Sequence, residues 1–210
     1  MTGTRRTKSQ QKILAAAEAL FLSQGYVGTS MDAITETAGV SKQTVYAHFA
    51  NKEALFLAMI DHLVGGATAA VRHRLPLPGP GDDLRDTLTD FARADLAVVL
   101  TPRLMGLRRL VIGEQARFPD LAASLFSNGP QGSIDRIRDI LNVFAGRGEL
   151  RPCDIDRAAE HFNWLVMGGP TSRAMLLGDG SFLPPDEQAR HAADCADIFC
   201  AAYAAGHANP

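Results

Sequence analysis

At 210 residues, with 46% hydrophobic and 21% charged side chains, the chain can bury a core of one larger domain or of two smaller ones, which excludes a wholly disordered protein. We find no uninterrupted apolar run near the roughly 20 residues that a membrane-spanning helix needs, so we expect a cytoplasmic protein without a membrane partner. The formal net charge of −2 is uneven, because residues 1–52 hold six basic and three acidic side chains while the remainder is net −5, and this confines positive potential to the N-terminal end.

Helical periodicity runs through the chain: apolar residues recur three and four positions apart, and no alternating Val, Ile and Thr run appears. This pattern predicts an all-α fold of about nine helices. The first helix is expected over residues 9–24, with Gly25 as its C-terminal cap. A fourth helix, capped by Asn51, is expected to reach about Arg74, before a proline-rich loop over 75–81. The helices predicted beyond this loop lie near 82–100, 102–116, 119–146, 155–177 and 185–206.

Two short helices between residues 30 and 48 are predicted to form a helix-turn-helix. Thr29 or Ser30 caps the first, Gly39 permits the tight turn, and Ser41 caps the second. Apolar side chains pack the two helices together and leave the polar side chains of the second facing outward. In such a motif the second helix enters the major groove of DNA, so the segment is a candidate DNA reader.

The outward side chains have the chemistry of DNA contacts. Lys42 and Gln43 can reach base edges, because lysine pairs with guanine and glutamine with adenine in the major groove, and Thr44 suits a thymine methyl. The side chains better suited to phosphate are Ser41, Tyr46, His48 and Lys52. An ordinary helical hairpin with solvated polar residues would give the same pattern.

The same region resembles the TetR family of bacterial repressors. The resembling segments are Ile13 to Ala17 with Phe21 and Gly25-Tyr26, Thr29 to Ile34, Ala38 to Phe49, and Asn51 to Leu55. The resemblance implies a three-helix DNA-binding domain over residues 1–52 and a helical ligand-binding and dimerisation domain over 53–210. Many relatives place an aromatic residue where this chain has Ala47, so a contact made by that ring is absent here.

By position, the resemblance implies operator contacts from Thr29, Ser41, Lys42, Thr44, Tyr46, His48 and Lys52. Gln43 joins them by its chemistry, and Ser30 because the amide groups of a helix N-terminus point at phosphate. The expected partner is a double-stranded DNA operator.

The run from Arg108 to Leu121 resembles the C-terminal domain of the AefR-like subgroup of that family. A single helix-turn-helix makes few contacts with DNA, so two copies on a palindrome are expected to supply the missing affinity. We expect the homodimer to form through the last two helices. The residues at helical spacing there are Phe162, Leu165, Val166, Gly169, Ala192, Ala196, Phe199 and Tyr203; a core within one chain is the alternative.

A ligand pocket needs apolar walls and a few polar groups. The candidate residues are Phe91, Met105, Arg108, Glu114, Phe118, His161, Trp164 and Met167, with Asn163 as a further polar contact. Each of these also fits ordinary core or surface. The inducer itself is unknown, and an apolar or aromatic small molecule is expected. Trp164 and His161, one turn apart, have the chemistry to grip a flat ligand.

No enzyme motif is found, because the sequence holds no GxSxG, P-loop or HExxH pattern. Cys153, Cys195 and Cys200 lack CxxC spacing, and His62 and His73 lack ligand partners, so no catalytic, metal or cofactor site is predicted. We therefore expect a ligand-responsive repressor that a small molecule releases from a palindromic operator. The alternative is a DNA-binding regulator whose C-terminal half is a protein-interaction module without an inducer.

Overall fold

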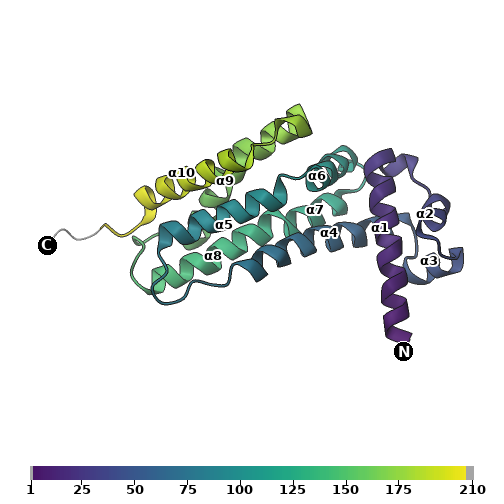
Figure 1. The fold of residues 1–210 in the computed structure, drawn as a ribbon, viewed down its shortest axis with the longest axis horizontal. Coiled ribbons are helices and arrows are strands. Elements are labelled where there is room, and N and C mark those ends of the chain that lie inside the picture. The colour runs from purple at the N-terminus through teal and green to yellow at the C-terminus, as the bar shows by residue number, and fades with distance from the viewer. Residues whose placement is uncertain (1, 207–210) are drawn as a thin grey trace. The chain divides into compact units, whose positions relative to one another are not determined.

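The computed structural model describes residues 2–206, and side chains at 6–67 and 69–206. The described part contains ten α-helices, one 3-10 turn and an isolated bridge between Leu150 and Ala204 in place of any strand. The all-α prediction is confirmed. The helices, shown in Figure 1, are α1 (Thr2–Gly28), α2 (Met31–Ala38), α3 (Lys42–His48), α4 (Lys52–Arg74), α5 (Leu84–Val99), α6 (Pro102–Glu114), α7 (Pro119–Asn128), α8 (Pro130–Gly146), α9 (Ile155–Leu177) and α10 (Pro185–Tyr203), with η1 (Asp179–Ser181) before α10.

The helices form two compact units. The N-terminal unit consists of the described residues up to Gly65 together with Gly106–Phe126, and the C-terminal unit of Gly66–Met105 with the described residues from Ser127 onward. The N-terminal unit therefore includes most of α6 and α7, from the middle of the chain. These units are defined by contacts within the fold. The boundary that the sequence predicts between a DNA-binding domain (1–52) and a ligand-binding domain (53–210) stays a prediction.

The predicted helix caps lie where the sequence places them. Ser30, Ser41 and Asn51 each accept a hydrogen bond from the backbone N–H three residues later, at 3.1, 3.1 and 2.8 Å. Gly25 and Gly39 have φ angles of 75° and 61°, in the left-handed region that favours glycine. Helix α1 is longer than the sequence predicts at both ends, since it begins at Thr2 instead of near residue 9 and continues to Gly28. Gly25, with φ 75° and ψ 172°, interrupts the helix there and does not end it.

The single helix predicted over 119–146 is wrong, because the structure has two helices there. α7 ends at Asn128, Gly129 takes the non-helical angles φ −97° and ψ −96°, and Pro130 opens α8. Proline lacks the N–H that an uninterrupted helix would use, and it disfavours helical angles in the residue before it. The Gly129-Pro130 pair therefore breaks the helix although the apolar periodicity continues through it.

An aromatic cluster forms the core of the N-terminal unit. Phe21 and Phe56 are fully buried, with ring centroids 4.7 Å apart, and Tyr26 lies 5.1 Å from Phe56. Phe118, from the corner between α6 and α7, packs edge-on against Tyr26 at 4.6 Å. The cluster thus joins α1, α4 and the α6–α7 corner.

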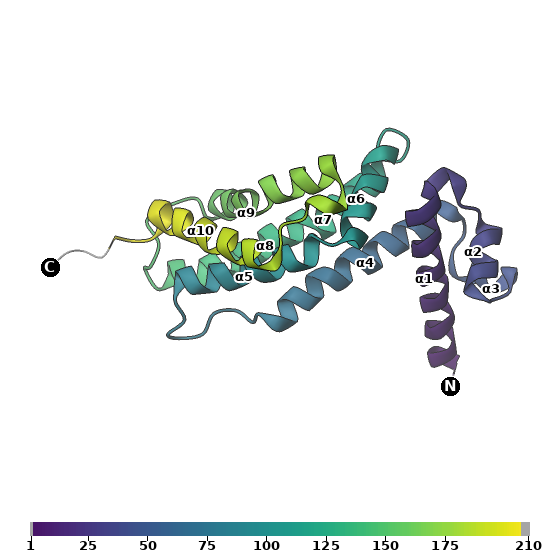
Figure 2. The same ribbon diagram turned by 45° about the horizontal axis from the view of Figure 1, so that its top comes forward.

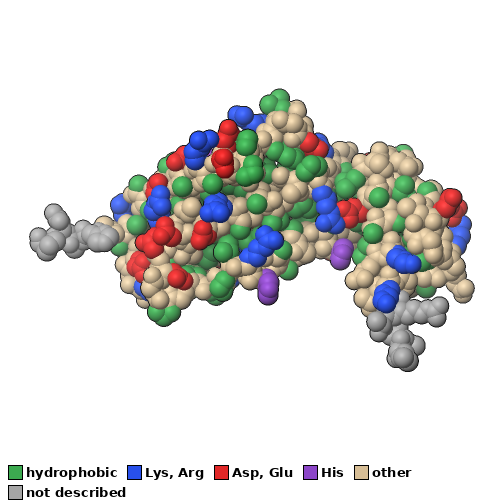
Figure 3. Space-filling model, in the orientation of Figure 1, with side chains coloured by type: hydrophobic (Ala, Val, Ile, Leu, Met, Phe, Trp, Pro, Cys, Tyr) green, Lys and Arg blue, Asp and Glu red, His purple; other side chains and the backbone are tan. Residues whose placement is uncertain are grey.

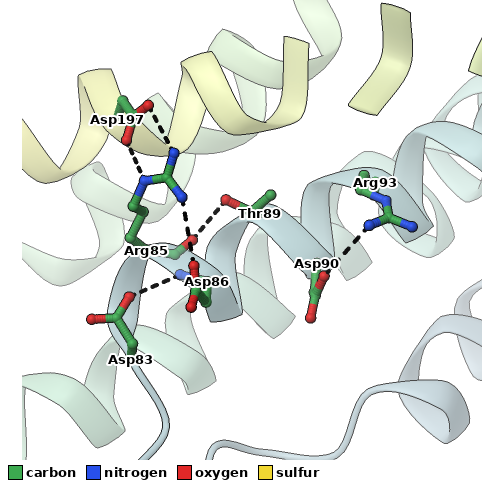
Figure 4. A network of polar contacts seen from close by, with 7 residues as sticks. All are labelled: Asp83, Arg85, Asp86, Thr89, Asp90, Arg93 and Asp197. Atoms are coloured by element: carbon green, nitrogen blue, oxygen red, sulfur yellow. Dashed lines mark hydrogen bonds and ion pairs between the residues drawn. The ribbon is translucent and has the colours of Figure 1, made fainter. Parts of the chain in front are cut away.

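The C-terminal unit packs α8 against α9, and α10 against both α5 and α9 (Figure 2). Its core includes Phe91, Leu96, Ile137, Phe144 and Phe162. Figure 4 shows how α5 is tied to α10 by Arg85, whose guanidinium donates through Nε and Nη2 to the two carboxylate oxygens of Asp197. Acidic and basic side chains are interspersed on the face of this unit seen in Figure 3.

Helix α4 is long and apolar enough, by length and composition, to cross a membrane. It differs from the uninterrupted apolar run sought in the sequence because Asp61 and His62 lie within it. Core helices of globular proteins pass the same test, and α4 buries Phe56, Met59 and Ile60 completely. We interpret it as a core helix.

The last two helices are linked at a proline. Pro170 lies inside α9 and has no N–H to donate to the carbonyl of Val166, four residues earlier. His191 of α10 lies 2.8 Å from that oxygen through Nε2 and supplies the missing donor. The Cys195 thiol, one turn further along α10, donates to the Leu165 carbonyl at 3.5 Å. Cys195 is 2% exposed, and this burial raises the pKa of its thiol to about 11.

His191→Ala is expected to lower the free energy of unfolding by about 1–3 kcal/mol, because it leaves the Val166 carbonyl unpaired in a buried site. Pro170→Ala restores a backbone N–H, so His191→Ala should cost clearly less in that background. Urea unfolding of the four chains of this double-mutant cycle measures the coupling. Equal costs of His191→Ala in the two backgrounds would contradict the assignment.

Candidate nucleic-acid interface

The buried faces of α2 and α3 fix how their other faces point. Ile34 and Val45 are fully buried, and Ala38 and Phe49 nearly so. Both helices pack against α1 as well as against each other. This is the apolar packing predicted from the sequence, and it leaves the polar residues of α3 facing outward.

Most of the predicted DNA-binding side chains are at least partly exposed. The exposed ones are Ser30, Ser41, Lys42, Gln43 and Tyr46, and the half-buried ones are Thr44, His48 and Lys52. Ser41 and Thr44 are joined by a hydroxyl–hydroxyl hydrogen bond of 2.8 Å. The outer face of α3 therefore offers one ammonium, one amide and several hydroxyl groups to a partner.

Lys42 is paired with a residue that the sequence analysis did not single out. Its Nζ lies 2.7 Å from a carboxylate oxygen of Asp32, in the first turn of α2. The hydrogen bond to Asp32 raises the pKa of Lys42 above its ordinary value. Since ten residues separate the two positions, only the turn at Gly39 brings them together.

Thr29 and Lys52 instead form hydrogen bonds to backbone carbonyls inside the N-terminal unit. Thr29 is 2% exposed, and its hydroxyl donates to the Gly25 carbonyl at 2.9 Å. The Lys52 ammonium donates to the carbonyls of Tyr26 and Thr29, both at 2.9 Å, and lies 4.3 Å from the centre of the Tyr26 ring. The Thr29 side chain thus has almost no surface for DNA, and two of the three N–H groups of Lys52 are already used.

The ammonium group of Lys52 is partly desolvated, and this changes its pKa. Burial lowers the pKa of Lys52, the positive charge of Arg117 lowers it further, and Glu114 opposes both. Burial also raises the pKa of Tyr26. Glu114 and Phe118, which were predicted to line a ligand pocket, thus lie beside Tyr26 and Lys52 at the α6–α7 corner.

His48, at the end of α3, is held by α1. Its Nε2 lies 3.1 Å from the Ser9 hydroxyl. This contact crosses from α3 to the first half of α1, a helix that the sequence predicts to begin only at about Ser9. It fixes the direction of the last turn of α3.

The remaining predicted pocket residues fall into different environments. Phe91, Met105 and Met167 belong to the packed core of the C-terminal unit. Arg108 is half-buried in the N-terminal unit. Trp164 is 41% exposed, and the exposed His161 is hydrogen-bonded through Nδ1 to the Tyr203 hydroxyl at 2.6 Å. Trp164 and His161 therefore face outward.

Trp164 and His161 line an open hollow of about 590 Å³ between the outer faces of α9 and α10. Ile198, 57% exposed, lies in the same hollow. Of the residues predicted for a dimer interface, five are instead buried in the core of the unit: Phe162, Val166, Ala192, Ala196 and Phe199. The other three, Leu165, Gly169 and Tyr203, are not buried.

Two buried side-chain nitrogens among the described residues of the C-terminal unit have no hydrogen-bond partner, Nε of Arg136 and the amide nitrogen of Asn163. Asn163 is 2% exposed, and its amide nitrogen makes no hydrogen bond. An unpaired buried amide costs free energy, and a bound molecule or water can remove that cost. No cluster of three metal-ligating side chains occurs among the described residues.

Two family models match the chain. Residues 13–59 match the bacterial regulatory proteins of the tetR family, and residues 86–205 match the C-terminal domain of AefR-like transcriptional repressors. The transcriptional regulator UidR of Escherichia coli (strain K12) is 34% identical over 158 residues, which cover 74% of this chain and 75% of UidR.

Solved structures agree over nearly the whole chain. A TetR-family regulator from Mesorhizobium loti is similar with a TM-score of 0.88 and 30% identity, over 96% of this chain and 99% of that one. The flavonoid-responsive regulator FrrA is similar with a TM-score of 0.78 and 32% identity, over 95% and 99% of the two chains.

Proposed function

Because the chain belongs to the TetR family of bacterial transcriptional regulators, which are not enzymes, we propose that it is a cytoplasmic, ligand-responsive repressor that binds a palindromic operator as a homodimer. The observation that carries the DNA-binding part is the α2–α3 pair, whose buried faces leave Lys42, Gln43 and Tyr46 exposed together on α3. The match of residues 86–205 to a repressor C-terminal domain supports repression.

The proposed contacts follow from exposure. Lys42 and Gln43 read base edges, with Thr44 against a thymine methyl. Ser30, Ser41 and Tyr46 bind phosphate, and the free amide groups at the N-termini of α2 and α3 assist them. His48 binds phosphate from the position that Ser9 gives it, and Lys52 uses its one remaining N–H. Thr29 positions Lys52 through its backbone carbonyl, and its own side chain makes no DNA contact.

The outer faces of α9 and α10 are the proposed dimer interface. Trp164 and Ile198 are large apolar side chains left exposed there, beside His161 and Tyr203. Such a surface suits a second copy of the same face across a two-fold axis. The interface predicted from sequence keeps its helices but changes its residues, because the five buried ones serve the core.

A small molecule is proposed to release the repressor, bound with the help of Asn163. The unpaired amide supports a ligand that is mostly apolar and carries one hydrogen-bonding group. The name of FrrA, a flavonoid-responsive regulator, supports an aromatic inducer. Such a ligand must bind better to a form whose recognition helices are wrongly spaced for DNA.

The proposed route of the signal within the N-terminal unit passes through the α6–α7 corner. Phe118 touches Tyr26, and Tyr26 holds Lys52 at the first residue of α4. A displaced corner would therefore disturb the start of α4 and the loop that precedes α2.

The alternative is a C-terminal half that binds another protein and no inducer. The apolar Leu176 and Leu177, 83% and 73% exposed at the end of α9, favour it. Thermal unfolding with a panel of flavonoids separates the two proposals: a ligand raises the midpoint of the wild type but not of Asn163→Leu, whereas an interaction module shows no shift in either.

DNA binding is tested by gel shift of the full chain on fragments of its own upstream region at several salt concentrations. We expect affinity to fall steeply with salt, and Lys42→Ala combined with Gln43→Ala to weaken binding of the preferred fragment by roughly 10–100-fold. Glu18→Gln, in the middle of α1, is a control expected to change little. A wild-type chain without salt-dependent affinity for any fragment would falsify the proposed function.

A further inference from the structure

The Asp32–Lys42 pair stands at the edge of the proposed DNA reader. Asp32 is the second residue of α2, and Lys42 is the first residue of α3. Their charged atoms lie 2.7 Å apart, yet their side chains remain 72% and 61% exposed. The pair therefore offers a carboxylate and an ammonium side by side to whatever approaches the outer face of the two helices.

This pair is poorly suited to binding phosphate. A phosphate meeting Lys42 also meets the negative Asp32, and the local charge of the two groups together is zero. Isolated exposed ion pairs contribute only about 0–1 kcal/mol to stability, so stabilising the fold does not account for the pair. A surface that satisfies both groups must present hydrogen-bond acceptors and a donor next to each other.

A G·C base pair presents such a surface in the major groove. Guanine offers the acceptors O6 and N7, which suit an ammonium, and cytosine offers its N4 amino group, which suits a carboxylate. An A·T pair also mixes donor and acceptor, but it gives the ammonium only one acceptor on adenine and places an apolar methyl beside the charges.

We propose that Asp32 is a specificity-determining residue, which accepts a hydrogen bond from cytosine while Lys42 donates to the guanine of the same base pair, once in each operator half-site. The inference rests on the proposed DNA-binding function. Asp32 then has two roles, since it holds Lys42 toward a base edge and also keeps that lysine from binding phosphate at unrelated sites.

The experiment selects binding sequences from a pool of randomised DNA duplexes with the full chain and with Asp32→Asn. The wild type is expected to select a symmetric consensus with a fixed G·C pair in each half. Asp32→Asn should relax that one position by roughly 5–100-fold in relative affinity and keep the others. Because Lys42 becomes free to bind phosphate, the affinity for unrelated duplex should increase. The slope of log K against log salt concentration should steepen by the equivalent of about one phosphate contact.

Glu36→Gln is the matched control. Glu36 is exposed on the same helix, one turn further along the same side, so the substitution removes an equal charge without touching the pair. It should leave the consensus unchanged. Lys42→Met should relax the same base pair as Asp32→Asn, and the double variant should add little, since the two residues act as one unit.

The possible results distinguish a failure of the proposed DNA-binding function from a failure of the Asp32 assignment alone. A wild type that enriches no sequence from the pool overturns the proposed function, and the assignment of Asp32 with it. A wild-type consensus that Asp32→Asn retains, or a fixed A·T pair at the affected position, overturns only the assignment of Asp32. Circular dichroism of each variant checks that α2 and α3 are folded, and Asp32→Ser replaces Asp32→Asn if that variant unfolds.

Discussion

A chain carrying Ile198→Glu is expected to remain folded, to sediment as a monomer and to bind a palindromic operator at least about a hundredfold more weakly than the wild type. Ile198 is 57% exposed on α10, so the glutamate is solvated in a single chain. In the proposed dimer the two-fold axis brings two such charges into one apolar interface, where an unpaired charge is costly. A monomer binds the operator through one DNA-binding unit only. It therefore loses the increase in affinity that two linked units give, of order 10²–10⁴.

Analytical ultracentrifugation and gel shift on a duplex with the selected consensus measure the two effects. Ile112→Glu is the matched control, because Ile112 is 58% exposed but lies on α6 in the N-terminal unit. We expect that variant to stay dimeric. If Ile198→Glu sediments as a dimer, the interface must be sought on another face.

Phe56→Ala is expected to be the most destabilising single substitution in the N-terminal unit. Phe56 is fully buried between Phe21 and Tyr26, at ring distances of 4.7 and 5.1 Å. Removing a buried phenyl ring costs about 3–5 kcal/mol, since the surrounding helices only partly close the cavity. For a chain of this size, that cost lowers Tm by on the order of 10 °C.

Thermal unfolding followed by circular dichroism, at one fixed protein concentration, measures this loss. DNA affinity should fall with it, because the same cluster positions the loop before α2 and the first turn of α4. Phe126→Ala, a change of the same size at a ring 49% exposed in the same unit, should shift Tm by far less. Similar shifts for both variants would show that the cluster is not the core of the unit.

The sequence predicts those parts of the fold that depend on local chemistry. The caps at Ser30, Ser41 and Asn51 and the turn at Gly39 are determined within three or four residues, and all are confirmed. The break at Gly129-Pro130 is equally local, but the apolar periodicity on both sides conceals it. Pro130 itself reveals the break, because helical backbone angles are disfavoured in the residue before a proline, here Gly129.

Features that depend on contacts between distant segments cannot be predicted in this way. Nothing in the sequence near Lys42 indicates Asp32 as its partner, and nothing near Tyr26 indicates Phe118. For the same reason, the sequence pattern places Phe162 and Phe199 in a dimer interface, although their rings pack on each other inside one chain, 5.2 Å apart. Periodicity shows that a helix face is apolar, but it does not say which neighbour covers that face.

The contact of Phe118 with Tyr26 matters to anyone who builds chimeric regulators. A graft that joins only residues 1–52 to a foreign sensor removes both Phe56 and Phe118, the two rings from outside that segment that pack on Tyr26. The transplanted reader would also lose Arg117 and Glu114, whose charges act on Lys52. A hybrid that keeps this chain's operator preference therefore has to carry the first turns of α4 and the α6–α7 corner along with residues 1–52, or supply aromatic side chains of its own in those places.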